Sequence, residues 1–392
     1  MSKTDKVKTK NIGEVSEFYS FVYVLANRFI PLVDGDLRPF NTQLEFLKAY
    51  RKESTVTVNG QKYDELNEYD LSSYNNRVVV RVPNNLSTKT ISSQLLKDRC
   101  EALRELLLNS NSHISEDNSI LTQLQELLQT SNLTAKASDK SDFSGEVRSA
   151  NVPVTHKLGF TVKSQVGSNS TLINASGKNS AFQYRVVHSD GSKLTPQQVK
   201  DLQQWPEKHK ALITRLIAEG YKLEFVKNLG DKLKYNLRLI DSVAPEIISV
   251  LLYERFYMRN ASVKLKEIVE WVCTDERASH YSCIMDLGDS FEDRVSSLMY
   301  KVKNILLAFT TGATVGSKWD GIDRANGGFL IVKKDCEVVC LELFTRNSIG
   351  QYLLNNTSFD NPSSTRHSYG ELYVESDCED LLIDLQLQVR FR

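Results

Sequence analysis

The sequence predicts a mixed α/β fold of the α+β kind, in which helices and strands both contribute to the core. Two patterns predict it: residues 13–29 (GEVSEFYSFVYVLANRF) repeat apolar side chains at helical spacing, and residues 76–82 (NRVVVRV) alternate as a strand does. A chain that is 41% hydrophobic and 25% charged can build a packed interior and is not disordered throughout. Its 392 residues allow two or three domains of about 150 residues each.

In the first half of the chain, helices precede a group of strands. The first helix, residues 13–29, ends before Pro31, because proline cannot continue a helix. Ser115 is placed to cap the helix that follows it. The expected order is a helix at 13–29, a strand at 76–82, helices at 91–108 and 115–129, and strands at 143–147, 158–164 and 181–187.

The second half is expected to be helical first and to close with strands. Residues 188–192 (HSDGS) are rich in turn formers and give the best candidate for a domain boundary, which predicts domains over 1–190 and 191–392. No internal repeat is visible, so a solenoid is disfavoured. The expected order is helices at 195–218, 242–257 and 289–308, a strand at 234–240, a hairpin of 328–333 with 337–344, a helix at 346–355, and strands at 369–375 and 381–391.

Several classes of protein are disfavoured by what the sequence lacks. No apolar run approaches the roughly 20 residues that cross a bilayer, and the lysine-rich start has no apolar segment behind it, so we expect a cytoplasmic protein without a membrane anchor. The six cysteines are too sparse for a disulfide framework, and none forms a C-x-x-C pair, which disfavours zinc and redox motifs.

The charges cancel over the whole chain but not along it. The 49 basic and 49 acidic residues give no net charge. Residues 200–264 nevertheless hold twelve basic against eight acidic residues, whereas 267–300 hold eight acidic against two basic. Separated signs allow a basic cleft for a polyanion, although ordinary surface patterning explains the same counts.

A lysine in the middle of a predicted strand is the first candidate for chemistry. In residues 157–165 (KLGFTVKSQ), apolar positions face a core and Thr161, Lys163 and Gln165 share the other face. One interpretation is an exposed lysine on a solvated sheet. The other is a lysine that the sheet holds rigidly in a cleft beside metal-binding carboxylates, where it orients a water or stabilises charge on a phosphate.

Carboxylates upstream could complete such a cleft. Asp139 and Asp142 come just before the strand at 143–147, in position to hold Mg²⁺ near the lysine, although a merely soluble loop would look the same. On the first helix, Glu14 falls within the apolar stripe of Phe18, Phe21 and Leu25, and Glu17 lies at its edge. A carboxylate there needs a partner or a metal, unless Glu14 simply sits at the favourable helix N-terminus.

Segments spread along nearly the whole chain resemble the HpaII family of type II restriction endonucleases. The opening GEVSEFY of residues 13–19 is similar to the first helix of that family, and residues 158–176 (LGFTVKSQVGSNSTLINAS) to its central strand and loop. Residues 327–334, residues 361–370 (NPSSTRHSYG) and the closing LQLQVRF resemble its C-terminal blocks. Residues 188–300 contribute little to the resemblance.

The resemblance implies a nuclease of the PD-(D/E)xK type, with a restriction-endonuclease-like mixed sheet flanked by helices and with Mg²⁺ as cofactor. Residues 1–190 would be the nuclease core, and 191–392 an α+β region for DNA recognition. Asp142 then corresponds to the metal carboxylate, with Asp139 as a rival, and Lys163 to the motif lysine. The acidic position two residues earlier is Thr161, so a second carboxylate would come from Glu14 or Glu17, and Gln165 is a further catalytic candidate.

Other polar stretches are expected to contact DNA. Serine, threonine and asparagine can bond to backbone and base edges, and Arg366 can reach a guanine with two hydrogen bonds. His367 is equally well explained as a solvated loop residue, and the glycines of 312–328 by tight turns. The expected DNA-binding residues are Ser164, Ser168, Asn169, Ser170, Thr171, Asn174, Lys318, Arg324, Asn326, Ser364, Arg366 and His367.

The resemblance therefore predicts an enzyme that cuts double-stranded DNA at a short, GC-rich palindrome such as CCGG. A palindromic site favours a homodimer. A separate methyltransferase would protect host DNA, since this chain shows no methyltransferase motif. The alternative is a sequence-specific DNA-binding protein that lost catalysis when its acidic position became Thr161.

Overall fold

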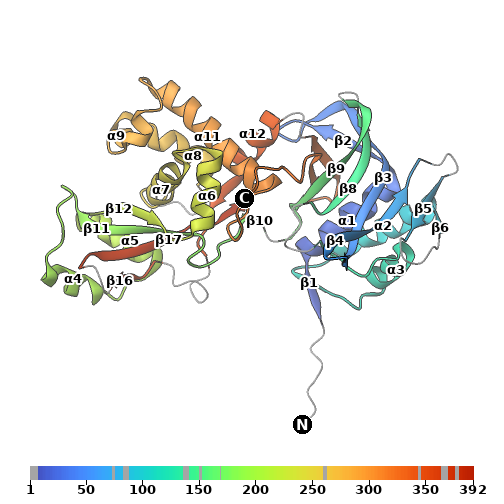
Figure 1. The fold of residues 1–392 in the computed structure, drawn as a ribbon, viewed down its shortest axis with the longest axis horizontal. Coiled ribbons are helices and arrows are strands. Elements are labelled where there is room, and N and C mark those ends of the chain that lie inside the picture. Colours follow the sequence, from blue (N-terminus) through green and yellow to red (C-terminus); the bar gives the residue numbers. More distant parts are fainter. Residues whose placement is uncertain are drawn as a thin grey trace, which may run out of the picture. The chain divides into compact units, whose positions relative to one another are not determined.

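The computed structural model confirms the mixed α+β class and divides the chain into two compact units (Figure 1). It describes residues 8–72, 76–82, 88–135, 141–149, 152–167, 169–258, 263–342, 346–362, 370–375 and 379–392. Unit 1 consists of Met1–Ser170 and Asp323–Ile349, and unit 2 of Thr171–Ile322 and Gly350–Arg392. The expected functional division into 1–190 and 191–392 stays a prediction.

Unit 1 is built on a nine-stranded mixed sheet in the order β2-β14-β13-β9-β8-β3-β4-β5-β6. Most neighbours are antiparallel, but β13 runs parallel to β9 and β14 parallel to β2. The β13/β14 hairpin, as expected from sequence, thus returns late in the chain to pair with the lysine strand β9. The strands are β2 Phe29–Val33, β3 Pro39–Val58, β4 Gln61–Asp70, β5 Arg77–Arg81, β6 Thr88–Ser92, β8 Phe143–Ser149, β9 Val152–Ser164, β13 Gly328–Val332 and β14 Val338–Glu342.

Helix α1, Ile12–Asn27, packs its apolar stripe against this sheet together with α2, Ser93–Leu108, and α3, Ser119–Leu128. Phe18, Phe21 and Leu25 are buried, as the helical spacing predicts. The ring centroid of Phe21 lies 5.2 Å from that of Phe143 on β8. The first predicted helix is therefore confirmed, and aromatic packing fixes it beside the β8/β9 pair. A short pairing of β1, Thr9–Asn11, with β7, His113–Ser115, lies next to its start.

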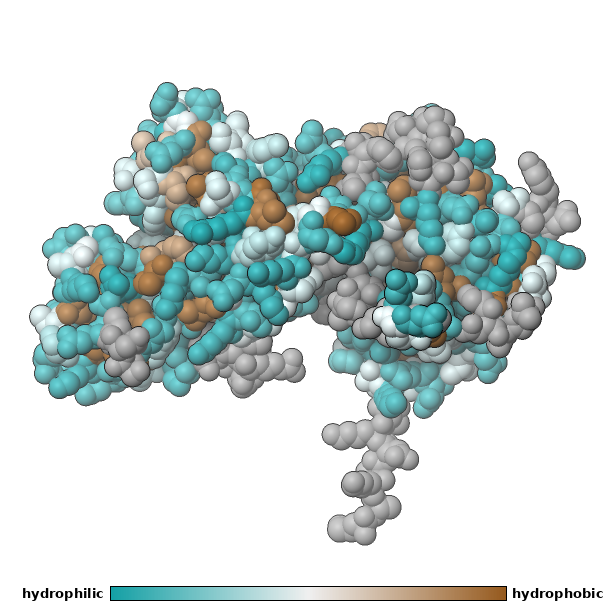
Figure 2. All heavy atoms as spheres, viewed as in Figure 1, coloured by the Kyte–Doolittle hydropathy of each residue, from teal (hydrophilic) through white to brown (hydrophobic). Residues whose placement is uncertain are grey.

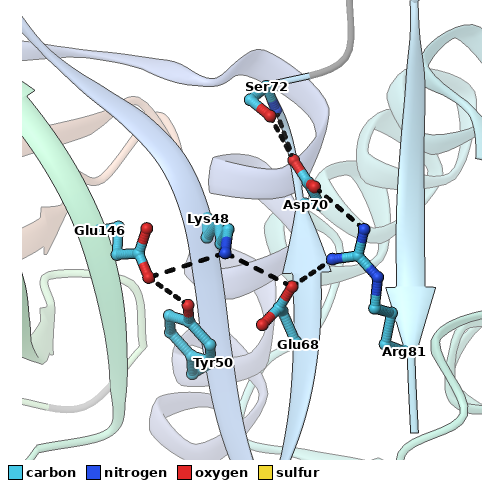
Figure 3. A network of polar contacts seen from close by, with 7 residues as sticks. All are labelled: Lys48, Tyr50, Glu68, Asp70, Ser72, Arg81 and Glu146. Atoms are coloured by element: carbon cyan, nitrogen blue, oxygen red, sulfur yellow. Dashed lines mark hydrogen bonds and ion pairs between the residues drawn. The ribbon is translucent and has the colours of Figure 1, made fainter.

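Charged side chains on the other face of this sheet bind one another across four strands (Figure 3). The ammonium group of Lys48 on β3 lies 3.6 Å from the carboxylate of Glu68 on β4 and 3.9 Å from that of Glu146 on β8. Arg81 on β5 pairs with Glu68 and Asp70, and the Tyr50 hydroxyl donates to Glu146. Cross-strand pairs of opposite charge stabilise a sheet, so we assign this network a structural role.

Unit 2 combines two smaller sheets with most of the helices. Its four-stranded sheet has the order β12-β11-β17-β16 and its three-stranded sheet the order β10-β18-β15. The strands are β10 Thr171–Ile173, β11 Ala181–His188, β12 Tyr221–Asn228, β15 Thr357–Phe359, β16 Leu372–Val374, β17 Leu381–Gln386 and β18 Val389–Phe391. The helices are α4 Pro196–Gln203, α5 His209–Ala218, α6 Asp231–Ile240, α7 Ala244–Glu254, α8 Leu265–Val272, α9 Asp275–Ala278, α10 Ser282–Met285 and α11 Phe291–Thr311, with α12 Arg346–Asn356 extending into it.

The strand expected at 234–240 is wrong, because these residues belong to helix α6. Leu233, Asn236 and Leu237 are buried at helical spacing and decide the structure, although the sequence between them also alternates. The strand of this region is β12, which precedes the helix.

Two expected helices also have different bounds. Helix α3 begins at Ser119, where the Asn118 side chain accepts a hydrogen bond from the amide of Ile120, so Ser115 is not its cap and instead ends β7. The helix expected at 195–218 is two helices, α4 and α5, separated at Trp205-Pro206, because proline lacks the amide hydrogen that a continuous helix needs.

Within the described part of the chain, no helix is both long and apolar enough to cross a membrane. The face drawn in Figure 2 is covered mainly by hydrophilic residues, with hydrophobic ones in scattered patches.

Candidate active site

Strand β9 holds Lys163 in the interior of the sheet of unit 1. Lys163 stands opposite Ile331 of β13 in a parallel pairing, and the adjacent Val162 belongs to the core that packs α1. The Lys163 side chain is partly buried, whereas Thr161, two residues earlier on the same strand, is 4% exposed. The interpretation of Lys163 as an exposed lysine on a solvated sheet therefore does not fit its surroundings.

Asp142 lies at the start of β8, directly beside the Thr161 position. Phe143 is paired with Phe160, and the Asp142 amide donates to the Phe160 carbonyl at 2.8 Å. The carboxylate accepts a hydrogen bond from the Val162 amide at 2.5 Å and another from the Thr161 hydroxyl at 3.1 Å. Thr161 thus occupies the expected acidic position as a hydrogen-bond donor that orients Asp142. This gives the threonine a place in the site although it cannot bind a metal as a carboxylate does.

Burial raises the pKa of Asp142, and the charge of Lys163 opposes this rise more than any other group. The hydrogen bonds from Val162 and Thr161 and the charge of Arg51 act in the same direction as Lys163. A carboxylate that is desolvated and held next to an ammonium group is typical of a functional site. The structure therefore brings Asp142 and Lys163 together, as the resemblance implied.

Glu17 on α1 is the second carboxylate of this site. Its side chain is partly buried and accepts a hydrogen bond from the Ala135 amide at 2.6 Å. Burial, and after it the negative charge of Asp142, raise the pKa of Glu17 to about 8, although the Ala135 amide and the charges of Arg51 and Lys163 lower it. The charge of Lys163 thus lowers the pKa of both carboxyl groups, which burial raises.

Glu14 has a different place at the start of the same helix. Its carboxylate accepts a hydrogen bond from the Asn11 amide at 2.9 Å, and the Asn11 side chain accepts one in return from the Glu14 amide. The carboxylate also lies 3.5 Å from the ammonium group of Lys10. This reciprocal capping box satisfies Glu14 at the helix N-terminus, so of the two glutamates Glu17 is the one that joins Asp142 and Lys163.

The loop before β8 holds Glu17 from outside the helix, and β3 anchors this loop. Glu53 on β3 accepts hydrogen bonds from the Thr130 hydroxyl at 2.6 Å and from the Ser131 amide at 2.9 Å. The Asn132 side chain donates to the Glu53 carbonyl at 3.2 Å. We call residues 130–135 the anchored loop, because its far end is Ala135, whose amide donates to Glu17.

Arg51, also on β3, is a buried cation of this site that the sequence did not suggest. Its guanidinium lies 5.1 Å from the ring centroids of both Phe18 and Phe21 and donates to the Asn132 carbonyl at 2.9 Å. It lowers the pKa of both Glu17 and Asp142. Strand β3 was not predicted, although Asn59-Gly60, with φ of 51° and 80°, is the usual hairpin signal between β3 and β4.

Glu17 and Asp142 fit a magnesium ion better than an ion that takes all of its ligands from the protein. Among the residues that the structure describes, no three histidine, cysteine, aspartate or glutamate side chains are grouped to hold a metal. Mg²⁺ commonly takes one or two carboxylates and completes its shell with water and phosphate oxygens. Glu17 and Asp142 can supply that number.

Comparison with known proteins decides the family. The family model described as HpaII restriction endonuclease matches residues 11–391. The chain belongs to the HpaII restriction endonuclease family. It is similar to the type II restriction enzyme HpaII of Haemophilus parainfluenzae, with 30% identity over 383 residues that cover 97% of this chain and 98% of the relative. No solved structure gives a significant match. The expected enzyme class, a type II site-specific deoxyribonuclease with DNA as substrate, is confirmed by this membership.

The DNA-contact candidates of this HpaII-family chain at the end of β9 have different surroundings. The Ser164 hydroxyl is buried and accepts a hydrogen bond from the Val166 amide at 3.0 Å, which gives it a role in the turn. Asn169 is exposed, and Ser170 is partly exposed. The Gln165 amide donates to the Val332 carbonyl at 2.8 Å. Ser168 lies outside the described residues.

The remaining candidates for DNA contact lie around β10 and in the glycine-rich segment 312–328. Around β10, Thr171 begins the strand and Asn174 is exposed. In the part of the glycine-rich segment that belongs to unit 2, Lys318 is exposed, and its ammonium group lies 5.1 Å from the Tyr235 ring centroid. In unit 1, the Asn326 side chain accepts a hydrogen bond from the Gly159 amide at 2.8 Å. Arg324 is exposed, and its backbone carbonyl packs closely against Gly159. A Cβ at Gly159 would lie 2.2 Å from the Arg324 carbonyl oxygen. Ser364, Arg366 and His367 lie outside the described residues.

Proposed function

We propose that this chain is a Mg²⁺-dependent type II restriction endonuclease that hydrolyses phosphodiester bonds in double-stranded DNA at a short GC-rich palindrome such as CCGG. The observation that carries the chemistry is the meeting of Glu17, Asp142 and Lys163 at the ends of β8 and β9 and on α1. The site sequence is supported only by the likeness to the HpaII family, and its palindromic form supports a homodimer. A separate methyltransferase would protect host DNA, and the cytoplasm is where we expect both to act.

Each group has a task in phosphodiester hydrolysis. Asp142 and Glu17 would hold the ion, which when bound neutralises charge on the phosphate and makes water more acidic. Lys163 would orient the attacking water or stabilise the charge that develops on the phosphate oxygens. Thr161 keeps the Asp142 carboxylate in position through its hydrogen bond. Gln165 is a further candidate from the same end of β9.

The test compares two lysines of the same strand. Lys163→Ala should lower the rate of cleavage about a hundredfold or more and leave DNA binding largely intact, because it removes a group that acts in the transition state. Lys157→Ala is the matched control, since Lys157 is exposed on β9, 3.9 Å from the Tyr50 ring centroid, and should cut at the wild-type rate. Wild-type cleavage by Lys163→Ala would refute the assignment.

The alternative, a DNA-binding protein without catalysis, makes a different prediction for the wild-type chain. Plasmid or phage DNA incubated with Mg²⁺ should give discrete bands, and sequencing their ends should give the recognised bases and the cut position. Specific retardation in a gel without cutting, in any divalent cation, would favour the binding protein. The Thr161–Asp142 hydrogen bond supports the enzyme, because the site remains organised around the carboxylate.

A further inference from the structure

Unit 2 contains a cavity that the proposed reaction does not use. It has a volume of about 630 Å³ and is lined by residues of β12, α7 and the α9–α10 segment. Six of its 16 lining residues are tyrosine or phenylalanine, although aromatic residues make up only 9% of the chain. A volume of this size is typical of sites for small organic ligands, which are usually lined by aromatic and apolar side chains with a few polar groups.

One wall of the cavity is fixed by a buried carboxylate. Glu254 at the end of α7 is fully buried and accepts hydrogen bonds from the Arg277 guanidinium, the Tyr281 hydroxyl and, at 3.1 Å, the Trp271 indole. Burying a carboxylate is costly unless several donors satisfy it. Of these donors, Arg277 and Tyr281 line the cavity. The buried charge therefore holds two lining side chains in one orientation, as the supporting groups of a binding site do.

Flat aromatic surfaces complete the wall. The Arg277 guanidinium lies 4.1 Å from the Tyr257 ring centroid, and the Tyr257 and Tyr253 hydroxyls are 2.8 Å apart. Tyr221, Phe225, Tyr257 and Tyr281 are all partly exposed. Rings that are held in place but not fully covered can stack on a planar ligand.

The charges at the cavity are balanced. Lys222 and Arg277 are matched by Glu224 and by Glu254 behind the wall. A site of this kind does not select a phosphate group by charge, but its ammonium, carboxylate and hydroxyl groups can bond to the edges of a planar heterocycle. Nucleobases combine an aromatic face with such edges, and they are the planar groups that DNA supplies.

We propose that this cavity binds a single unstacked nucleobase. Two sources share this chemistry: a base turned out of the bound duplex, and the base of a free nucleotide. The first source rests on the proposed function, because it requires binding to the DNA site, whereas the second does not. Glu254 holds Tyr281 in place and holds Arg277 over one face of the Tyr257 ring, and we assign stacking to the other face of that ring.

The first experiment titrates each of the four deoxynucleoside monophosphates into the full chain and follows binding by saturation-transfer NMR. Tyr257→Ala should weaken binding about tenfold, because stacking on an aromatic ring is lost. Tyr257→Phe keeps the ring and should bind as the wild type does. Tyr300→Ala, which removes a 66% exposed tyrosine of α11 outside the cavity, should also be unchanged. A circular dichroism spectrum like that of the wild type will show that Tyr257→Ala is folded.

The second experiment separates the two sources. A set of duplexes contains the sequence that the enzyme cuts, each with a fluorescent adenine analogue at a different position. The fluorescence of each duplex is measured when the chain binds it in the presence of a divalent ion that does not support cleavage, such as Ca²⁺. A fluorescence change at one position indicates a base turned out of the duplex, if Tyr257→Ala abolishes the change and Tyr257→Phe retains it. Nucleotide binding without such a change indicates free nucleotide as the source. The proposal is overturned if no nucleotide binds and no position responds, or if Tyr257→Ala behaves as the wild type in both experiments. Failure to cleave DNA would refute the proposed function and leave the nucleotide titration valid.

Discussion

Glu14 and Glu17 stand one turn apart on α1, and their surroundings separate a structural from a functional carboxylate. Glu14 meets the free amides at the helix start, where a negative charge is favoured. Glu17 is desolvated near Asp142 and accepts a hydrogen bond from the Ala135 amide. One turn of helix therefore separates a partly solvated helix cap from a buried carboxyl group whose charged form is disfavoured.

This contrast predicts different results for the same substitution. Glu17→Gln should lower cleavage at saturating DNA about a hundredfold or more, because charge stabilisation by a held metal ion is worth several kcal/mol. Glu14→Gln should cost about 1 kcal/mol of stability or less and leave the cleavage rate unchanged. Single-turnover rates and thermal melts of both variants check this, and equal losses of rate would contradict it.

The raised pKa of Glu17 predicts a pH dependence of stability in the absence of metal. The folded chain keeps this proton up to about pH 8, whereas the unfolded chain releases it near 4.5, the ordinary pKa of a glutamate side chain. Between these values the unfolded state binds fewer protons, so stability should fall as pH rises, by up to about 1.4 kcal/mol per pH unit. Melts in EDTA across this range should show the fall, and Glu17→Gln should remove it. A wild-type profile that Glu17→Gln does not alter would contradict the assigned pKa.

At the scale of elements, the anchored loop connects the sheet to Glu17, the carboxylate that we propose holds the metal. Glu53 and Arg51 of β3 hold residues 130–132, and the same loop ends on the amide that bonds to Glu17. Strand β3 thereby helps to set the position of a helix residue through the loop.

Glu53→Ala should therefore act on metal use more than on DNA binding. Removing the acceptor frees the Thr130 and Ser131 donors, and we expect the Mg²⁺ concentration for half-maximal cleavage to rise about tenfold, as for other supporting residues of metal sites. Glu65→Ala is the control, since it removes a carboxylate of the same sheet that accepts a hydrogen bond from Ser54 on β3. A shift of equal size in both variants would mean a general loss of sheet stability.

At the scale of the whole molecule, the chain returns to unit 1 after building most of unit 2. Gly328–Val332 pairs in parallel with Phe160–Ser164 and covers the edge of β9 on which Lys163 lies. Residues 1–170 alone would leave this edge open, with its apolar side chains exposed.

We expect the fragment 1–170 not to unfold cooperatively. Fusing residues 323–349 to it through a flexible linker should restore a cooperative transition, because β13 and β14 then complete the sheet. Denaturant unfolding followed by circular dichroism checks both. A cooperative transition of 1–170 alone would show that the late hairpin is dispensable.

Much of the fold was open to prediction from local patterns. The stripe of α1, the alternation of β5 and β11, the long helix α11 and the β13/β14 hairpin were all expected, because each buries one face within a short stretch. Helix α6 was not, since its residues fit both spacings and packing chose the helix. The long β3/β4 hairpin was missed because polar residues occupy both of its faces, including the buried Arg51.

The sequence by itself indicated the family, Lys163 and Asp142, because these rest on the order of residues along short segments, but it left Asp139, which lies outside the described residues, as a rival to Asp142. Only the tertiary structure decided between Glu14 and Glu17, gave Thr161 its hydrogen bond to Asp142, and brought Arg51 to the site. Those choices depend on desolvation and on groups more than a hundred residues apart, such as Ala135 and Glu17. Burial of that kind is created when helix, sheet and loop pack together, and no local pattern records it.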